Sequence, residues 1–222
     1  MKNIFFTAIT ILSTSFTFGQ LKKNVGDFNS LKVYDRIPVE LIQSDTNSVE
    51  ISGNLENQVD VVNKNGELKI KMNSLNLMLG NKVNVKVYYK SIYDIQASQG
   101  ASIFSQDNLD MFILKITSNE GSSIKLDINS KKVDAKVNSG GEILLTGETE
   151  ILTVTSLAGG KFLGKELLAN KAELISNAVG FIEAYVKDEV EAKTRVGGSI
   201  SIFGNPTFKK EKRLAGGTIS YY

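Results

Sequence analysis

The sequence contains no cysteine and no histidine among its 222 residues. The absence of cysteine excludes a disulfide framework and a lipid-modified N-terminal cysteine. The absence of both residue types excludes Ser-His triads, thiol nucleophiles and imidazole metal sites. No Gly-x-x-x-x-Gly-Lys-Ser/Thr string is present, so a phosphate-binding loop is excluded as well. Carboxylates are the only side chains left for acid-base catalysis.

Excess charge of either sign is also lacking, since 26 Lys and Arg residues face 24 Asp and Glu residues. No basic stripe with interleaved aromatic residues occurs, so we expect no nucleic-acid partner. The N-terminal apolar run, residues 4–12, is too short to span a bilayer, and no later run approaches that length. We therefore expect no transmembrane span.

The first twenty residues have the composition of a secretory signal peptide. Lys2 precedes the apolar run, and small and polar residues follow it. Thr17 and Gly19 suit a cleavage site that would leave Gln20 as the new N-terminus. We predict a signal peptide at residues 1–19 and an exported mature chain.

Residues 92–222 repeat about every twenty residues, and each repeat contains a pair of small residues. The pairs are Gly100-Ala101, Gly121-Ser122, Gly140-Gly141, Gly159-Gly160, Val179-Gly180, Gly197-Gly198 and Gly216-Gly217. A period of this length in strand-like sequence predicts a β-solenoid whose coils turn at these pairs. Glycine suits such corners because it reaches positive φ without a Cβ clash.

Alternation within each repeat predicts which side chains point inward. Three apolar columns are expected to form the core: Ile103, Ile124, Ile143, Phe162, Ile182, Ile200 and Ile219; Tyr93, Leu114, Val133, Leu152, Ala172 and Val190; and Ile95, Ile116, Ala135, Val154, Leu174 and Ala192. The columns between them, which include Asp94, Lys115, Glu173 and Glu191, are expected to face solvent. A single coil cannot bury its apolar row, so neighbouring coils must stack around a shared core.

Residues 25–89 also alternate like strands, at 31–33, 39–42, 49–51, 59–62, 68–72 and 83–89. Asn65-Gly66 predicts a hairpin with a type I′ turn, and Gly80-Asn81 marks another turn. Antiparallel pairing is thus likelier here than in the repeat region. We divide the chain into a signal peptide (1–19), an N-terminal β-strand region (20–90) that caps or continues the solenoid, and the repeat region (91–222). Residues 20–222 are expected to form one continuous structural unit.

Candidate catalytic residues are confined to one outward column. Glu173 and Glu191 are expected on adjacent coils about 5 Å apart, the spacing of a retaining glycosidase pair, with Lys193 and Arg195 nearby. Exposed carboxylates keep ordinary pKa values, however, and charged neighbours arise by chance in such a column. We assign no catalytic, cofactor-binding or metal-ligating residue and leave open whether Glu173 and Glu191 react. Asp127-Ile128-Asn129 lacks most of the ligands of a calcium loop.

Two further groups of polar residues have alternative interpretations. Asn119, Asn138 and Asn177 lie two residues before their turns, where we favour turn chemistry over a sugar-binding row. The basic run 209–213 follows a break at 203–206, which contains Pro206. It could contact an anionic surface, but we favour a solvated loop that guards the end of the solenoid.

Three features together resemble the head GIN domain family, also described as auto-transporter adhesins. They are the segment 26–50 that opens with GDFNSL, the coils with small residues and glycine at their turns, and the ending from FGNP at 203–206 to Ile219. The family typically has Ser-Gly-Ser-Gly turns, from which Val179-Gly180 departs most. The resemblance implies a right-handed β-helix-like solenoid that is exported and can be exposed at the cell surface. It implies no catalytic residues and no cofactor. We expect the chain in the periplasm, at the outer membrane or outside the cell.

Together these observations favour an all-β, exported, non-enzymatic module that binds an unidentified glycan or protein at the cell envelope. A flat repetitive surface suits extended binding. The alternative is a polysaccharide-acting β-helix hydrolase or lyase that uses surface carboxylates. The sequence leaves the ligand, its binding residues and the oligomeric state open.

Overall fold

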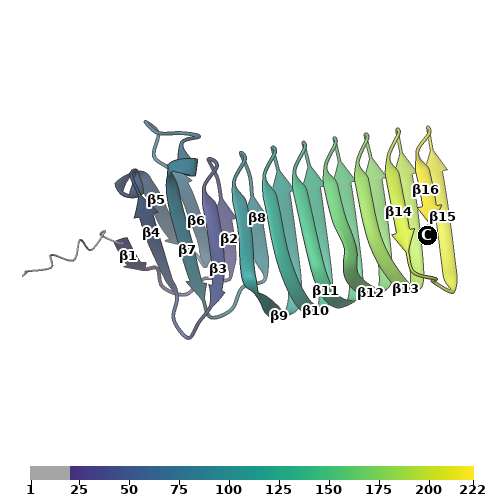
Figure 1. Cartoon of the computed structure of the whole chain (residues 1–222), viewed down its shortest axis with the longest axis horizontal. Helices are drawn as coiled ribbons and strands as arrows, with labels where there is room; N and C mark the ends of the chain where they lie inside the picture. The colour runs from purple at the N-terminus through teal and green to yellow at the C-terminus, as the bar shows by residue number, and fades with distance from the viewer. Residues whose placement is uncertain (1–20) are drawn as a thin grey trace, which may run out of the picture.

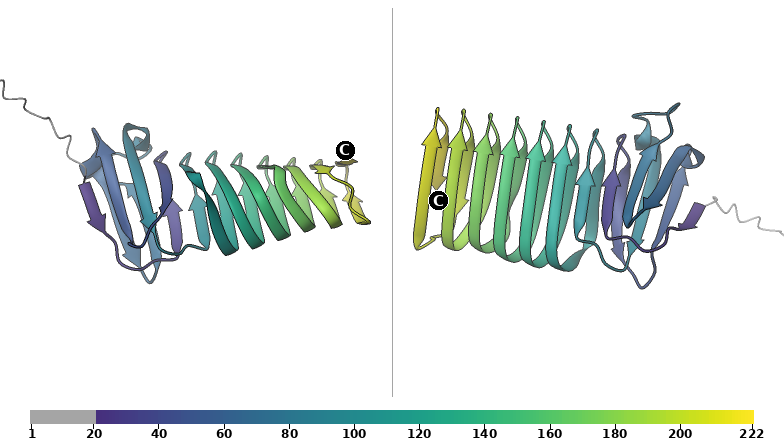
Figure 2. Two further views of the ribbon diagram at one scale, coloured as in Figure 1. Left: turned by 60° about the horizontal axis from the view of Figure 1, so that its bottom comes forward. Right: turned by 180° about the vertical axis from the view of Figure 1, so that it is seen from behind.

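The computed structural model describes residues 21–222, so the predicted signal peptide lies outside the described residues. These residues form an elongated β-solenoid, with tight turns along one edge and wide bends along the other (Figures 1 and 2). Short 3-10 helices are η1 (Glu56–Gln58) and η2 (Gly80–Lys82). The strands are β1 (Leu21–Asn24), β2 (Ser30–Val33), β3 (Pro38–Gln43), β4 (Ser48–Gly53), β5 (Val59–Lys64), β6 (Glu67–Met72), β7 (Val83–Tyr89), β8 (Asp94–Ala97), β9 (Ser102–Asn119), β10 (Ser123–Asn138), β11 (Glu142–Leu157), β12 (Lys161–Asn177), β13 (Phe181–Arg195), β14 (Ser199–Phe203), β15 (Phe208–Leu214) and β16 (Thr218–Tyr221).

Strands β9 to β13 form the regular part of the solenoid. Each runs down one face, bends around the edge and returns along the other face (Figure 1). Neighbours pair in parallel, so that equivalent residues such as Ile124 and Ile143 are register partners. Register shifts interrupt the first half of several strands, between Lys125 and Asp127 of β10, Leu144 and Thr146 of β11, and Gly164 and Leu168 of β12, and one more, between Ala169 and Lys171, lies at the bend of β12. The face that precedes the bend therefore varies from coil to coil, whereas the face that follows it stays in register.

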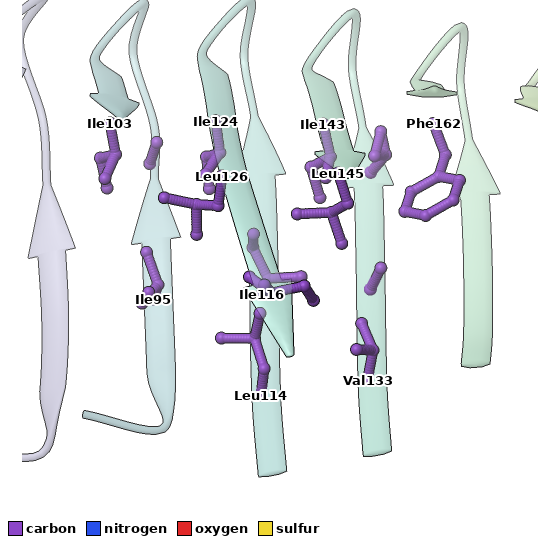
Figure 3. Packing of buried hydrophobic residues seen from close by; sticks show 14 of the residues in the cluster. Ile95, Ile103, Leu114, Ile116, Ile124, Leu126, Val133, Ile143, Leu145 and Phe162 are labelled. Atoms are coloured by element: carbon purple, nitrogen blue, oxygen red, sulfur yellow. The ribbon is translucent and has the colours of Figure 1, made fainter. Parts of the chain in front are cut away.

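The core consists of apolar rows that run along the solenoid axis. Ile103, Ile124, Ile143 and Phe162 form one such row between the two faces (Figure 3). Each fully buried side chain of this size contributes about 1.5–3 kcal/mol through removal from water. The predicted inward columns are confirmed at every position except Tyr93, which is 47% exposed. That prediction is wrong because Tyr93 precedes β8 and lies on the bend edge, where alternation is not yet established.

The turns confirm the role predicted for the small-residue pairs. At each turn the residue before the pair and the first residue of the pair have positive φ, as in Ser139 and Gly140. The second residue packs against the preceding coil, and a Cβ on Gly141 would lie 2.4 Å from the carbonyl oxygen of Ser118. Val179 takes the place of the first glycine at its turn and adopts φ +63°, so this corner keeps the conformation of the others.

Buried hydroxyl groups brace several turns from inside, a feature that the apolar pattern did not predict. Ser118, Ser156 and Ser176 are fully buried just before their turns. Ser156 Oγ donates to the carbonyl oxygen of Gly160 at 2.7 Å, and Ser176 Oγ donates to that of Gly180 at 2.6 Å. Each bond gives a buried hydroxyl group its partner and ties the end of the strand to the corner, while the same carbonyl oxygen also accepts an amide of the next coil.

The N-terminal region contains the six predicted strands and extends both faces of the solenoid. β2 and β3 join the stack in parallel, β2 against β8 and β3 against β9. β6 and β7 add the next layer in parallel, against β2 and β3 respectively. β4 and β5 then pair antiparallel with β7 and β6, and β1 with β4. The predicted hairpin joins β5 to β6, with Asn65 and Gly66 at φ +53° and +80°.

Candidate functional site

A cleft of about 620 Å³ opens at the bend edge, where the N-terminal region meets the first long coil. One wall comes from Tyr89 at the end of β7 and from the segment that follows it, including Tyr93, and the other comes from the bend of β9, including Phe112. A second hollow of about 650 Å³ lies beside it along the bends of the next coils. Residues 110–112 line both, so the two hollows form one groove. We call it the bend groove.

The bend itself explains why apolar side chains are exposed here. Met111 and Leu114 of β9 point inward, whereas Phe112 and Ile113 between them are both exposed. Two consecutive outward residues interrupt the alternation because the strand turns the corner at this point. Phe112 is 70% exposed and Tyr93 47%. Together they place two aromatic rings in the walls of one cleft.

Polar groups surround these rings. Asn129 Nδ2 donates to Asp110 Oδ1 at 3.0 Å, and Lys115 Nζ lies 3.5 Å from Asp94 Oδ2. Lys131 Nζ lies 5.2 Å from the centroid of the Phe112 ring. Burial, with a smaller contribution from Asp107, raises the pKa of Tyr89 to about 12, so its phenol stays neutral. The groove thus combines apolar ring surface with hydrogen-bonding groups, a composition suited to reversible ligand binding.

The predicted carboxylate pair lies elsewhere on the solenoid. Glu173 and Glu191 are register partners on β12 and β13, as expected. Lys193 Nζ lies 2.7 Å from Glu191 Oε1 and 3.5 Å from Glu173 Oε1. The hydrogen bonds from Lys193 and then Lys210 lower the pKa of Glu191. A glycosidase acid needs a raised pKa, so this environment favours the opposite protonation state.

A comparison with known families places the whole chain. A family model described as "Putative auto-transporter adhesin, head GIN domain" matches residues 27–206. The chain is a member of this family. No curated protein matches it.

Solved structures share the head GIN fold at low sequence identity. A protein described as a putative adhesin from Bacteroides fragilis superposes with a TM-score of 0.85 at 21% identity, covering 94% of this chain and 98% of that one. One described as a putative adhesin from Parabacteroides merdae gives 0.71 at 19% identity, with 92% and 95% covered. One described as a putative lipid binding protein from Parabacteroides distasonis gives 0.67 at 19% identity, with 92% and 96% covered. These likenesses establish the shared fold.

The remaining predicted groups lie away from the groove. Asn119, Asn138 and Asn177 are half-buried beside their turns, at the opposite edge.

The basic run 209–213 is strand β15, paired in parallel with β13, so its prediction as a loop is wrong. Each residue from Phe208 to Leu214 pairs with one from Glu189 to Arg195, so β15 extends the parallel sheet by one strand. Asp127 accepts a hydrogen bond from Thr146 Oγ1 at 2.9 Å. Within residues 21–222 no cluster of acidic side chains could hold a metal ion.

Sequence reasoning did not identify the bend groove of this head GIN chain. Its residues come from segments about twenty positions apart, and only the fold brings Tyr93 and Phe112 together. One signal was available, since Phe112-Ile113 breaks the alternation of β9 with two apolar residues. The two helices described, η1 and η2, are too short to cross a membrane.

Proposed function

We propose that this head GIN domain chain is an exported, non-enzymatic module that binds a glycan in the bend groove. The exposed rings of Tyr93 and Phe112 in the walls of one cleft carry the proposal. Sugar rings present flat C–H faces that pack on aromatic side chains, and hydroxyl groups that bond to carboxylates, amides and ammonium groups. The cleft offers Asp110, Asp134 and Lys115 for those bonds.

The length of the groove favours an oligosaccharide. The second hollow continues past Phe112 and is lined by Asn129, Glu148 and Asn170 from three successive coils. Parallel coils repeat at about 4.8 Å, which is close to the size of a sugar unit. A chain of sugars could therefore contact one coil after another along the bend edge.

Adhesion at the cell envelope is consistent with the rest of the chain. The first 19 residues are predicted to be a signal peptide, and the family is described as adhesins. Lys193 and Lys210 hold Glu191 in its charged form, which favours binding over acid catalysis at the pair of Glu173 and Glu191. We infer a periplasmic, outer-membrane-associated or extracellular location.

A glycan array with the chain from Gln20 onward tests the proposal, with mass spectrometry of the same wells to detect cleavage. We expect binding without cleavage. Phe112→Ala and Tyr93→Ala should each weaken it by about tenfold, because each removes a ring that the ligand covers. Phe208→Ala is the matched control, since Phe208 is an exposed ring on β15 outside the groove.

Three outcomes would contradict the proposal. Absence of glycan binding would reject the ligand class. An equal loss in Phe208→Ala would reject the groove as the site. Cleavage that disappears in Glu173→Gln or Glu191→Gln would show that the chain is a carbohydrate-active enzyme.

A further inference from the structure

One position on the turn edge does not carry a tight turn. β6 and β7 are equivalent to the two halves of a coil, since they pair in parallel with β2 and β3. Residues 73–82 connect them, where the regular coils use a short corner of small residues. This segment projects beyond the row of turns at the N-terminal end (Figures 1 and 2). We call residues 73–79 the edge loop.

The edge loop exposes four large apolar side chains. Leu75 is 89% exposed and Leu77 56%, while Met78 and Leu79 are each 37% exposed. A single exposed leucine needs no explanation, but four within five residues on a projecting segment form a concentrated apolar tip. None of the four belongs to the core of the solenoid.

Hydrogen bonds hold this tip in place at both ends. The buried Asp35 accepts a bond from the Met72 amide through Oδ2 at 3.0 Å, and its carbonyl oxygen accepts one from the Gly80 amide at 3.0 Å. Asn73 Nδ2 donates to Gln58 Oε1 at 2.6 Å, and Asn76 Nδ2 donates to Asn73 Oδ1 at 3.0 Å. The neighbouring turn and η1 thus fix the backbone of the loop while its apolar side chains point outward.

The shape and charge of the tip indicate what it contacts. It is convex and aliphatic, and it lacks the aromatic and arginine anchors that dominate protein interfaces. Lys71 and Lys82 flank it, and neither forms a salt bridge within the part of the chain that the structure describes. No acidic residue occurs in residues 68–93. Glu56 and Asp60 are the acidic residues on the adjoining η1 and β5.

We propose that the edge loop inserts its apolar side chains into the interface of a lipid membrane that carries anionic head groups. Apolar side chains beside lysines form the combination that binds such interfaces, because aliphatic groups enter the acyl boundary while ammonium groups meet the head groups. The loop and the bend groove lie on opposite edges. Membrane contact and ligand binding can therefore occur together and are tested by different variants.

The absence of tryptophan from the sequence provides a direct measurement. In the chain from Gln20 onward, Leu77→Trp would place a single reporter in the loop. Phosphatidylglycerol-containing vesicles should shift its emission to shorter wavelength, and brominated lipids should quench it. Val179→Trp is the matched control, because Val179 is exposed at a tight turn on the same edge. Its emission should not change.

Vesicle co-sedimentation of variants without tryptophan gives the second measurement. Leu75→Ser combined with Leu77→Ser should reduce partitioning by at least about tenfold, given the apolar area withdrawn from the lipid. Val179→Ser combined with Val196→Ser should leave it unchanged, and circular dichroism would confirm that both variants fold. High salt should weaken binding by screening the two lysines.

Failure of the vesicles to shift the Leu77→Trp emission would overturn the proposal. A shift that depends on protein concentration without vesicles would identify a second copy of the chain as the occupant. Equal loss in the Val179 and Val196 pair would show that the edge loop has no special part in binding.

Discussion

The turn pairs allow a quantitative test of why the coils close as they do. Gly159 and Gly160 are adjacent but are constrained in different ways. Gly159 has φ +76°, and a Cβ there would meet nothing within 4 Å. A Cβ on Gly160 would lie 2.6 Å from the carbonyl oxygen of Val137. The first glycine is therefore required for its backbone angle, and the second for the space it leaves to the preceding coil.

Alanine at each position separates the two effects. A left-handed backbone costs an L-residue about 1–2 kcal/mol, and the reduced freedom of the unfolded chain offsets about 0.4–1 kcal/mol. Gly159→Ala should thus lower the free energy of unfolding by about 1 kcal/mol. Gly160→Ala forces the stacked backbone apart and should cost more, by up to about 3 kcal/mol, in the range of overpacked interiors.

Val179 offers the reverse substitution. It occupies the position of Gly159 in the next coil, with φ +63°, and its side chain is 71% exposed. Val179→Gly removes the backbone strain and loses little packing. After the entropy of glycine in the unfolded chain is subtracted, we expect a gain of about 0.5–1 kcal/mol. For a chain of this size the melting temperature should rise by about 1–4 °C.

Differential scanning calorimetry and urea unfolding of the three variants in one buffer would measure these changes. The expected order of stability is Val179→Gly, then the parent chain, then Gly159→Ala, then Gly160→Ala. A lower melting temperature for Val179→Gly would refute the strain argument. Equal stability of the two alanine variants would show that crowding against the preceding coil is unimportant.

Two further predictions concern buried hydroxyls and pH. Thr194 Oγ1 is buried without a hydrogen-bond partner among the described residues, so Thr194→Val should raise the free energy of unfolding by about 1 kcal/mol. Ser156 Oγ donates to the carbonyl oxygen of Gly160, so Ser156→Ala should lower it by about 1 kcal/mol. Urea unfolding would measure both changes. The hydrogen bond from Lys32 lowers the pKa of Glu67, so its contribution to stability is present above the ordinary pKa of 4.5 and is lost as pH falls through the lower folded value. Glu67→Gln should therefore be less stable than the parent at pH 7 and equally stable at low pH in parallel unfolding curves. A difference that persists in acid would argue against the ion pair as its cause.

The alternation of apolar residues made most of the fold predictable. Each strand residue faces one side or the other with a period of two, so the row containing Ile103 and Phe162 could be placed without knowledge of the partner strands. The positions of the corners could be predicted from glycine and asparagine, because these residues adopt positive φ whatever their distant neighbours are, as in the Asn65-Gly66 hairpin. These features depend on residues close together in the chain.

The features that escaped prediction depend on pairing between distant segments. β2 lies between β6 and β8, although the chain visits β3 to β5 before it reaches β6. No local pattern encodes that order. The bend groove has the same origin, because its walls come from segments that only the stacking of the coils brings together, as in the meeting of Tyr93 with Phe112. The buried serines that precede the turns also escaped prediction, because they are polar residues at inward positions, where the pattern predicts apolar side chains.

The two ends of the solenoid determine which surfaces remain for recognition. In β15 the register partners of Val190, Ala192 and Thr194 are Lys209, Glu211 and Arg213. The former three are buried, whereas the latter three are exposed. A further coil, or the end of a second molecule, would have to bury these charges, of which Arg213 and Glu211 form an ion pair at 2.8 Å, so charge at inward register positions opposes stacking at this end. At the other end, antiparallel β1 and β5 interrupt the parallel stack. Both ends are therefore unsuited to stacking. The bend groove on one long edge and the edge loop on the other expose apolar side chains, and a ligand that covers these side chains removes apolar surface from water.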